Sequence, residues 1–187
     1  MKKPEILGCR ELVKTRLFRV EELTLKFSNG AERTYERLGR FGGGHKAVMV
    51  VPLVDNNRFL MIREYAAGTE DYQLTLPKGL VEAGETLIEG ANRELKEEIG
   101  HGATQWHELT QFTLSPNYMC SSIHVVVARG LYEEKLEGDE PEPLIVEEHS
   151  FDQLLELNER PDFSEGRALA ALYLVRDQLQ QGLLFQD

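Results

Sequence analysis

The sequence predicts an α/β protein that carries a β-hairpin at its N-terminal end. Residues 15–38 consist of strand-like stretches around a Ser-Asn-Gly turn, which is typical of a hairpin. From residue 46 onward, strand patterns alternate with helical patterns. The most distinctive segment is an acidic stretch at residues 79–101, which contains an amphipathic helix.

We expect the hairpin extension to occupy residues 1–45 and the main domain to occupy residues 46–187. The Gly-rich segment 39–44 (GRFGGG) lies between them and indicates a linker. It does not fit a phosphate-binding loop, because no Lys-Ser/Thr follows it and no helix begins there. A chain of 187 residues is long enough for one domain with a proper core and a small appendage.

The main domain is expected to hold six strands and three helices. The predicted strands are residues 47–54, 59–65, 72–76, 108–114, 122–128 and 144–146. The predicted helices are residues 87–99, 151–158 with Ser150 as a cap, and 164–181. Residues 132–143 are acidic and rich in Gly and Pro, so we expect a mobile loop there.

Charge and composition exclude several classes of protein. The net charge of −11 argues against a protein that binds a nucleic-acid backbone. No apolar run is long enough for a membrane span or typical of a secretory signal, so we expect a cytoplasmic protein. Cys9 and Cys120 are too few for a disulfide framework or a zinc site and are interpreted as reduced thiols.

The basic residues are concentrated at the front of the chain. The first 46 residues hold eleven of the 21 Lys and Arg but only six of the 32 Asp and Glu. Such a segment suits docking on the acidic domain, on a partner subunit, or beside a ligand that carries phosphate; a solvated surface is the simpler alternative.

The helix in the acidic stretch has a clear start and a clear end. Thr86 and Glu89 match a capping box, and Gly100 is a natural stop. Apolar residues recur along it at helical spacing and should face the core: Ile88, Ala91, Leu95 and Ile99.

Three carboxylates on this helix predict a metal site. Glu94, Glu97 and Glu98 stand at i, i+3 and i+4, so they project from one side of the helix. Like charges at this spacing destabilise a bare helix by a few tenths of a kcal/mol per pair. Clustered carboxylate oxygens are what Mg²⁺ and Mn²⁺ prefer, and a bound divalent cation explains the arrangement.

The loop before the helix is expected to bring Glu85 round to Arg93, and this pair would hold the metal ligands in place. The whole stretch resembles the signature of the Nudix hydrolase family. The matching positions are Gly79, Glu85, Arg93, Glu94, Leu95, Glu97, Glu98 and Gly100. The final position holds His101 where the family has an apolar residue, and it lies away from the carboxylates.

The resemblance implies an α/β/α Nudix sandwich with a mixed sheet and a metal-dependent hydrolysis of a pyrophosphate bond. It implies Mg²⁺, with Mn²⁺ as an alternative, bound by Glu94 and Glu98, with Glu97 assisting directly or through water. The Gly79 carbonyl is a further ligand by resemblance. Arg93 and Glu85 would support the catalytic helix.

The N-terminal hairpin looks like the extension of ADP-ribose pyrophosphatases within this family, where it takes part in dimerisation, so we expect a homodimer. A Pro downstream of the signature goes with ADP-ribose hydrolysis, and a Tyr slightly later goes with diadenosine polyphosphates. Pro116 and Tyr118 both occur here. The expected substrates are ADP-ribose, NADH and dinucleoside polyphosphates such as diadenosine triphosphate, each cut to AMP and the other phosphate half.

The general base remains open between several glutamates. In ADP-ribose pyrophosphatases a mobile acidic loop late in the chain supplies it. Residues 136–143 offer Glu137, Glu140 and Glu142, of which we prefer Glu140 and then Glu142. Glu97 on the helix is another candidate, and a solvated charge run is the simpler interpretation of the loop.

Substrate contacts are assigned from residue type and position. Arg63 follows the second apolar strand, and Arg37 and Arg40 belong to the basic segment; we expect them to contact phosphate or adenine. Tyr65 and Tyr118 suit stacking on an adenine, although a rim position explains a tyrosine equally well.

Two other functions are consistent with part of this pattern. One is a housecleaning hydrolase of nucleoside triphosphates, which the downstream Pro and the hairpin argue against. The other is a non-catalytic sensor of nucleotide sugars. Such sensors often lose glutamates of the signature, whereas this chain keeps all four.

Overall fold

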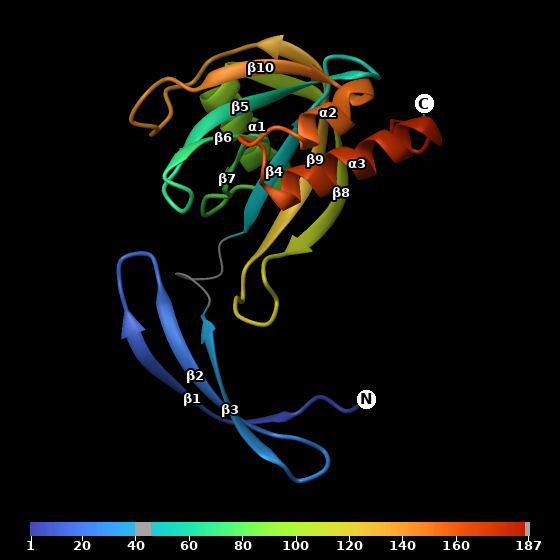
Figure 1. Ribbon diagram of the computed structural model, residues 1–187. Helices are drawn as coiled ribbons and strands as arrows, with labels where there is room; N and C mark the ends of the chain where they lie inside the picture. Colours follow the sequence, from blue (N-terminus) through green and yellow to red (C-terminus); the bar gives the residue numbers. More distant parts are fainter. Residues whose placement is uncertain (40–45, 186–187) are drawn as a thin grey trace. The chain divides into compact units, whose positions relative to one another are not determined.

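The computed structural model describes residues 1–39 and 46–185, which form two compact units (Figure 1). The first unit contains residues 1–39 and the segment Thr113–Ile123, and the second contains the remainder. The first unit is therefore discontinuous in sequence, whereas the sequence predicts one boundary after residue 45. Residues 40–44 of the linker predicted at 39–44 and the candidate Arg40 lie outside the described residues.

The first unit contains an antiparallel sheet of three strands in the order β1-β2-β3. The strands are β1 (Glu5–Lys14), β2 (Arg19–Lys26) and β3 (Glu32–Leu38). The predicted hairpin corresponds to β2 and β3, and their turn contains Gly30 at φ +82°, a conformation that favours glycine. The sequence did not reveal β1, because irregular pairing between Ile6 and Gly8 interrupts the alternation that identifies a strand.

The second unit contains two sheets, in the strand orders β10-β5-β6 and β7-β4-β9-β8. Their strands are β4 (Ala47–Pro52), β5 (Arg58–Ala66), β6 (Asp71–Thr75), β7 (Lys78–Leu80), β8 (His101–Thr113), β9 (Ser122–Glu133) and β10 (Ile145–Ser150). The six predicted strands are all present. The sequence did not predict β7, because three residues are too few for a periodic pattern. β8 begins at His101, directly after the helix and seven residues before its predicted start.

The helices of the second unit are α1 (Leu87–Ile99), α2 (Leu154–Asn158) and α3 (Gly166–Gln180). The predicted helix at 151–158 divides into a 3₁₀ turn, η2 (Phe151–Gln153), and the short α2. The expected Ser150 cap is wrong, because its hydroxyl bonds the Gln153 side chain at 3.1 Å and caps no backbone N–H. None of the helices in the described residues is long and apolar enough to cross a membrane.

The core of the second unit lies where α1 packs against β4 and β7, while α3 also contacts β4 (Figure 1). Ala91, Leu95 and Ile99 are buried there among Val48, Val50, Ile62 and Val126. Ile88 packs against the edge of the same cluster. The predicted apolar stripe of the helix is therefore confirmed, and burial of this stripe orients the neighbouring face of α1, which carries the glutamates.

Candidate active site

Both ends of α1 are held as the sequence predicts. The Thr86 hydroxyl accepts from the Glu89 N–H at 3.2 Å, and the Glu89 carboxylate accepts from the Thr86 N–H at 2.7 Å. Gly100 ends the helix at φ +72° and donates to the Leu95 and Lys96 carbonyls. A helix that is capped at both ends gives its glutamates fixed directions.

Arg93 forms hydrogen bonds with several groups on and around the polar face of α1. Its Nε lies 2.9 Å from Glu85, and its Nη1 lies 2.9 Å from Glu94 and 2.8 Å from Glu97. Its Nη2 donates to the Leu80 carbonyl at 2.7 Å. The predicted pairing of Arg93 with Glu85 is confirmed, and the bond from Arg93 holds the pKa of Glu85 below its usual value. One guanidinium therefore ties the loop, β7 and two helix carboxylates together.

Glu94 and Glu98 are buried carboxylates, each with 9% of its surface exposed. Burial raises the pKa of Glu98 to about 8 and raises the pKa of Glu94 as well. The Lys78 backbone N–H donates to Glu98 at 3.0 Å. A cation placed between two such groups would offset the cost of keeping them charged in this environment.

Gly79 allows β7 to approach the side of α1 that carries Glu94 closely. A Cβ at position 79 would overlap the carboxylate of Glu94. The backbone of residue 79 and the carboxylate of Glu94 therefore lie next to each other, and their assignment to a metal site stays a prediction.

Glu140 reaches the helix from the loop of residues 134–144, which joins β9 to β10. A Cβ on Gly138 would overlap the Glu140 carboxylate and would stand 3.5 Å from the Cβ of Glu97. The negative charge of Glu140 also contributes to the raised pKa values of Glu94 and Glu98. The structure thus brings Glu140 to the helix carboxylates, whereas Glu142 is bonded to the hydroxyl of Tyr72.

The donor set fits a hard divalent cation. Glu94, Glu97 and Glu98 offer oxygen ligands, and the Gly79 backbone lies beside the first of them. In residues 1–39 and 46–185, no three acidic, His or Cys side chains already stand in ligand geometry. Arg93 holds one oxygen of Glu94 and one of Glu97, and each carboxylate has a second oxygen that this bond does not use.

Lys78 and Glu64 are site residues that the sequence did not single out. The Lys78 ammonium forms an ion pair with Glu64, and its positive charge opposes the rise in the pKa of Glu98. A lone Lys before a Gly carries no recognisable pattern. Its relation to Glu98 depends on β7 folding against α1.

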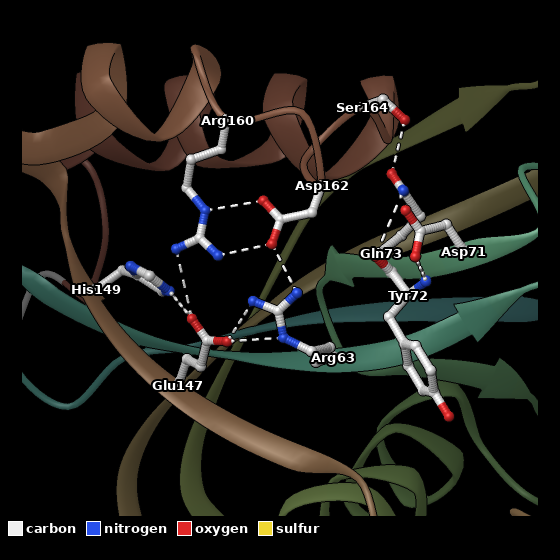
Figure 2. A network of polar contacts seen from close by, with 9 residues as sticks. All are labelled: Arg63, Asp71, Tyr72, Gln73, Glu147, His149, Arg160, Asp162 and Ser164. Atoms are coloured by element: carbon white, nitrogen blue, oxygen red, sulfur yellow. Dashed lines mark hydrogen bonds and ion pairs between the residues drawn. The ribbon is translucent and has the colours of Figure 1, made fainter.

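Arg63 takes part in a network of ion pairs (Figure 2). Its guanidinium lies 2.7 Å from Glu147 and 2.6 Å from Asp162, and Arg160 lies 2.7 Å from the same Asp162. The network joins β5, β10 and the segment before α3. The predicted contact of Arg63 with substrate would require exchange of these partners, so the geometry favours a structural role.

The other predicted substrate residues are found in two places. Tyr65 is 52% exposed and lies edge-on to Tyr72, with ring centroids 5.6 Å apart. Arg37, in the first unit, forms an ion pair with Glu21 at 2.9 Å. Tyr118 is 67% exposed, and its carbonyl accepts from the Leu38 N–H at 2.7 Å.

Pro116 lies in the same segment of the first unit, between β8 and β9. The roles of Arg37, Tyr65, Pro116 and Tyr118 in substrate binding stay predictions.

The fold and the site together define a Nudix enzyme. Residues 43–171 match the NUDIX domain, and residues 4–37 match the NudE-type Nudix hydrolase N-terminal domain. The chain therefore belongs to the Nudix hydrolase family, and the fold class and enzyme class predicted from the sequence are confirmed.

Individual relatives are similar over most of their length. The ADP compounds hydrolase NudE of Escherichia coli (strain K12) is 47% identical over 180 residues, which cover 96% of this chain and 95% of that protein. An ADP-ribose pyrophosphatase of Bacillus subtilis (strain 168) is 31% identical over 142 residues, 75% of this chain and 76% of that one. A crystal structure of an ADP compounds hydrolase superposes with a TM-score of 0.89 at 46% identity, covering 98% of both chains.

Proposed function

We propose that this enzyme hydrolyses the pyrophosphate bond of small molecules linked to ADP, and that it releases AMP and the other phosphate half. The observation that carries the proposal is the cluster of carboxylates around α1: Arg93 braces Glu94, the Glu94 side chain contacts Gly79, and the charge of Glu140 acts on both Glu94 and Glu98. The names of the relatives, an ADP compounds hydrolase and an ADP-ribose pyrophosphatase, support the choice of substrate class.

We assign Mg²⁺ as the cofactor, with Mn²⁺ as an alternative. Glu94 and Glu98 would hold it, with Glu97 assisting directly or through water and the Gly79 carbonyl as a further ligand. When bound, the metal supplies neutralisation of the pyrophosphate charge and a lowered pKa for water. Because burial raises the pKa values of Glu94 and Glu98, a cation would compete with protons for these carboxylates, and its binding would lower their pKa values and release protons.

Glu140 is our choice as general base. It would take a proton from the water whose oxygen attacks phosphorus, while the bridging P–O bond breaks and its electron pair leaves with the second phosphate. Glu142 and Glu97 are the alternatives. Arg93 and Glu85 hold the helix and its loop in position during this step.

A substrate panel tests the proposal. Purified protein is incubated with ADP-ribose, NADH, diadenosine triphosphate and the four dNTPs, each with Mg²⁺ or Mn²⁺, and the products are separated by chromatography. We expect AMP from the ADP compounds and little reaction with dNTPs. Turnover of dNTPs alone would indicate the triphosphate hydrolase, and binding of ADP-ribose without release of AMP would indicate the sensor.

We also propose a homodimer that assembles through the first unit. β1 has no fully buried residue, and apolar side chains of this unit are exposed, among them Ile6 (59%), Val13 (53%) and Phe18 (53%). A small sheet with apolar side chains in water needs a partner surface. Light scattering should give twice the mass of the chain, and Ile6→Lys should shift it toward the monomer. A monomeric wild-type protein would contradict this assignment.

The cytoplasmic location and the lack of nucleic-acid or membrane partners stay predictions.

A further inference from the structure

A hydrogen bond between Tyr72 and Glu142 fastens the second half of the loop formed by residues 134–144. The Tyr72 hydroxyl donates to the Glu142 carboxylate, and this bond raises the pKa of Tyr72. Tyr72 belongs to β6, where it pairs with Tyr65 of β5, and the two rings pack edge-on at an interplanar angle of 73°. The donor of this bond is therefore anchored in a sheet.

The first half of the same loop is attached to the end of α1. The Glu134 N–H donates to the Gly100 carbonyl at 3.0 Å, and the Leu136 N–H donates to the Lys96 carbonyl at 3.3 Å. The Lys96 ammonium lies 2.9 Å from the Glu134 carboxylate. The loop is thus held at two points, one on α1 and one on β6.

Glu140 lies between these two attachments and close to the second. Pro141 separates it from Glu142, and Pro143 follows. Proline fixes its own φ and restricts the residue before it to extended conformations, so Glu140, Pro141 and Glu142 form a stiff segment. A bond that fixes Glu142 therefore also limits where the Glu140 carboxylate can lie.

We propose that Tyr72 and Glu142 form a latch that positions Glu140 over the carboxylates of α1. The proposal rests on the proposed function, in which Glu140 takes the proton from the attacking water. Glu142 is then a positioning residue and not an alternative base, and Tyr72 is a second positioning residue in a strand outside the Nudix signature. Opening of the latch frees the loop for passage of substrate and AMP.

Three variants separate a latch from a base. Tyr72→Phe removes only the hydroxyl, Glu142→Ala removes the acceptor, and Glu142→Gln keeps an acceptor oxygen but cannot act as a base. We expect the first two to lower kcat for ADP-ribose by roughly fivefold and Glu142→Gln to retain most of it. The double variant of Tyr72→Phe with Glu142→Ala should be no slower than either single variant, because both remove one bond.

Proteolysis gives a readout that does not depend on turnover. A Glu-specific protease acts on wild type and on Tyr72→Phe without substrate, and mass spectrometry follows cleavage after Glu137, because the prolines that follow Glu140 and Glu142 block cleavage at those two positions. We expect the variant to be cut several-fold faster in this loop. Tyr173→Phe is the matched control, since its ring packs on Arg176 in α3, and it should change neither cleavage nor kcat.

The two proposals can fail separately. If the wild type hydrolyses no ADP compound, the proposed function is wrong, and loop cleavage still tests the latch. The latch is overturned by a Glu142→Gln enzyme as inactive as Glu142→Ala, by unchanged cleavage of the Tyr72→Phe loop, or by faster cleavage with unchanged kcat.

Discussion

The carboxylate of Glu94 occupies the space that a side chain at Gly79 would fill. Gly79 belongs to β7 and Glu94 to α1, so this contact joins the strand before the acidic loop to the helix after it. The glycine is needed here for close approach and not for an unusual backbone conformation, because it is absent from the positive-φ glycines. Gly79 therefore determines where the carboxylate of Glu94, the proposed metal ligand, can lie.

Gly79→Ala should reduce activity without unfolding the protein. The new Cβ would push the flexible end of Glu94 away from its present position, and changing a group that orients a metal ligand typically costs about 10- to 100-fold in metal affinity or activity. The activation constant for Mg²⁺ should rise while the melting temperature changes little. Gly68→Ala is the control, because a Cβ there meets nothing within 4 Å. Equal Mg²⁺ activation in both variants would show that Glu94 is not a ligand.

Glu98→Gln should abolish turnover and leave the fold intact. The substitution removes the negative charge of the oxygen that is proposed to bind the metal, and this loss should lower kcat by about a thousandfold. Since burial raises the pKa of Glu98 to about 8, this side chain is mostly neutral at pH 7 without metal, and a neutral glutamine fits the same place. The variant is assayed for AMP release and for thermal unfolding beside Glu156→Gln, a change in α2. Normal turnover by Glu98→Gln would remove it from the metal site.

Arg93→Lys should loosen the site and destabilise the protein. A lysine cannot reproduce the bonds to Glu85, Glu94, Glu97 and the Leu80 carbonyl, because it has no planar fork of donors. We expect a loss of about 2 kcal/mol in the free energy of unfolding, measured with urea, and a higher Mg²⁺ requirement. Arg176→Lys is the comparison, since Arg176 pairs with the neighbouring Asp177. A loss no larger than in that variant would argue against a bracing role.

The ion pairs around Arg63 should make the free energy of unfolding depend on pH in the acidic range. A hydrogen bond from Arg160, with another from Arg63, holds the pKa of Asp162 well below its usual value. A carboxyl with a lowered folded-state pKa contributes its full stabilisation above its unfolded pKa of 3.8, and this contribution declines as the pH falls from that value through the folded-state pKa. Asp162→Asn should cost about 1 kcal/mol at pH 7 and less at pH 3, where part of the contribution is already lost.

Urea midpoints of wild type and Asp162→Asn at the two pH values provide the measurement. Asp177→Asn serves as the control, because the Asp177 side chain is 52% exposed and pairs with its neighbour in the sequence, Arg176. If the urea midpoints of wild type and Asp162→Asn differ by the same amount at both pH values, the pKa of Asp162 is not lowered by folding, which contradicts this prediction.

Local sequence was sufficient for the helix at the centre of the site. The capping box of Thr86 and Glu89, the stop at Gly100 and the apolar stripe all depend on spacing along one helix, and a periodic pattern of thirteen residues is enough to specify it. The pairing of Glu85 with Arg93 followed from the same short stretch. The family of the chain depends on these few positions as well.

Tertiary structure alone decided the relations between distant segments. β7 became a strand because Val48 and Gly79 pair, and only this pairing puts Lys78 beside Glu98. Arg63 looked like a phosphate ligand, but carboxylates 84 and 99 residues further along the chain pair with it. Likewise, Glu140 and Glu142 are indistinguishable as acidic loop residues, and only the fold directs one toward α1 and the other toward Tyr72. The spacing of apolar and polar residues predicts which residues share a face of one helix or strand. Contacts between different helices and strands depend instead on how their buried faces pack together.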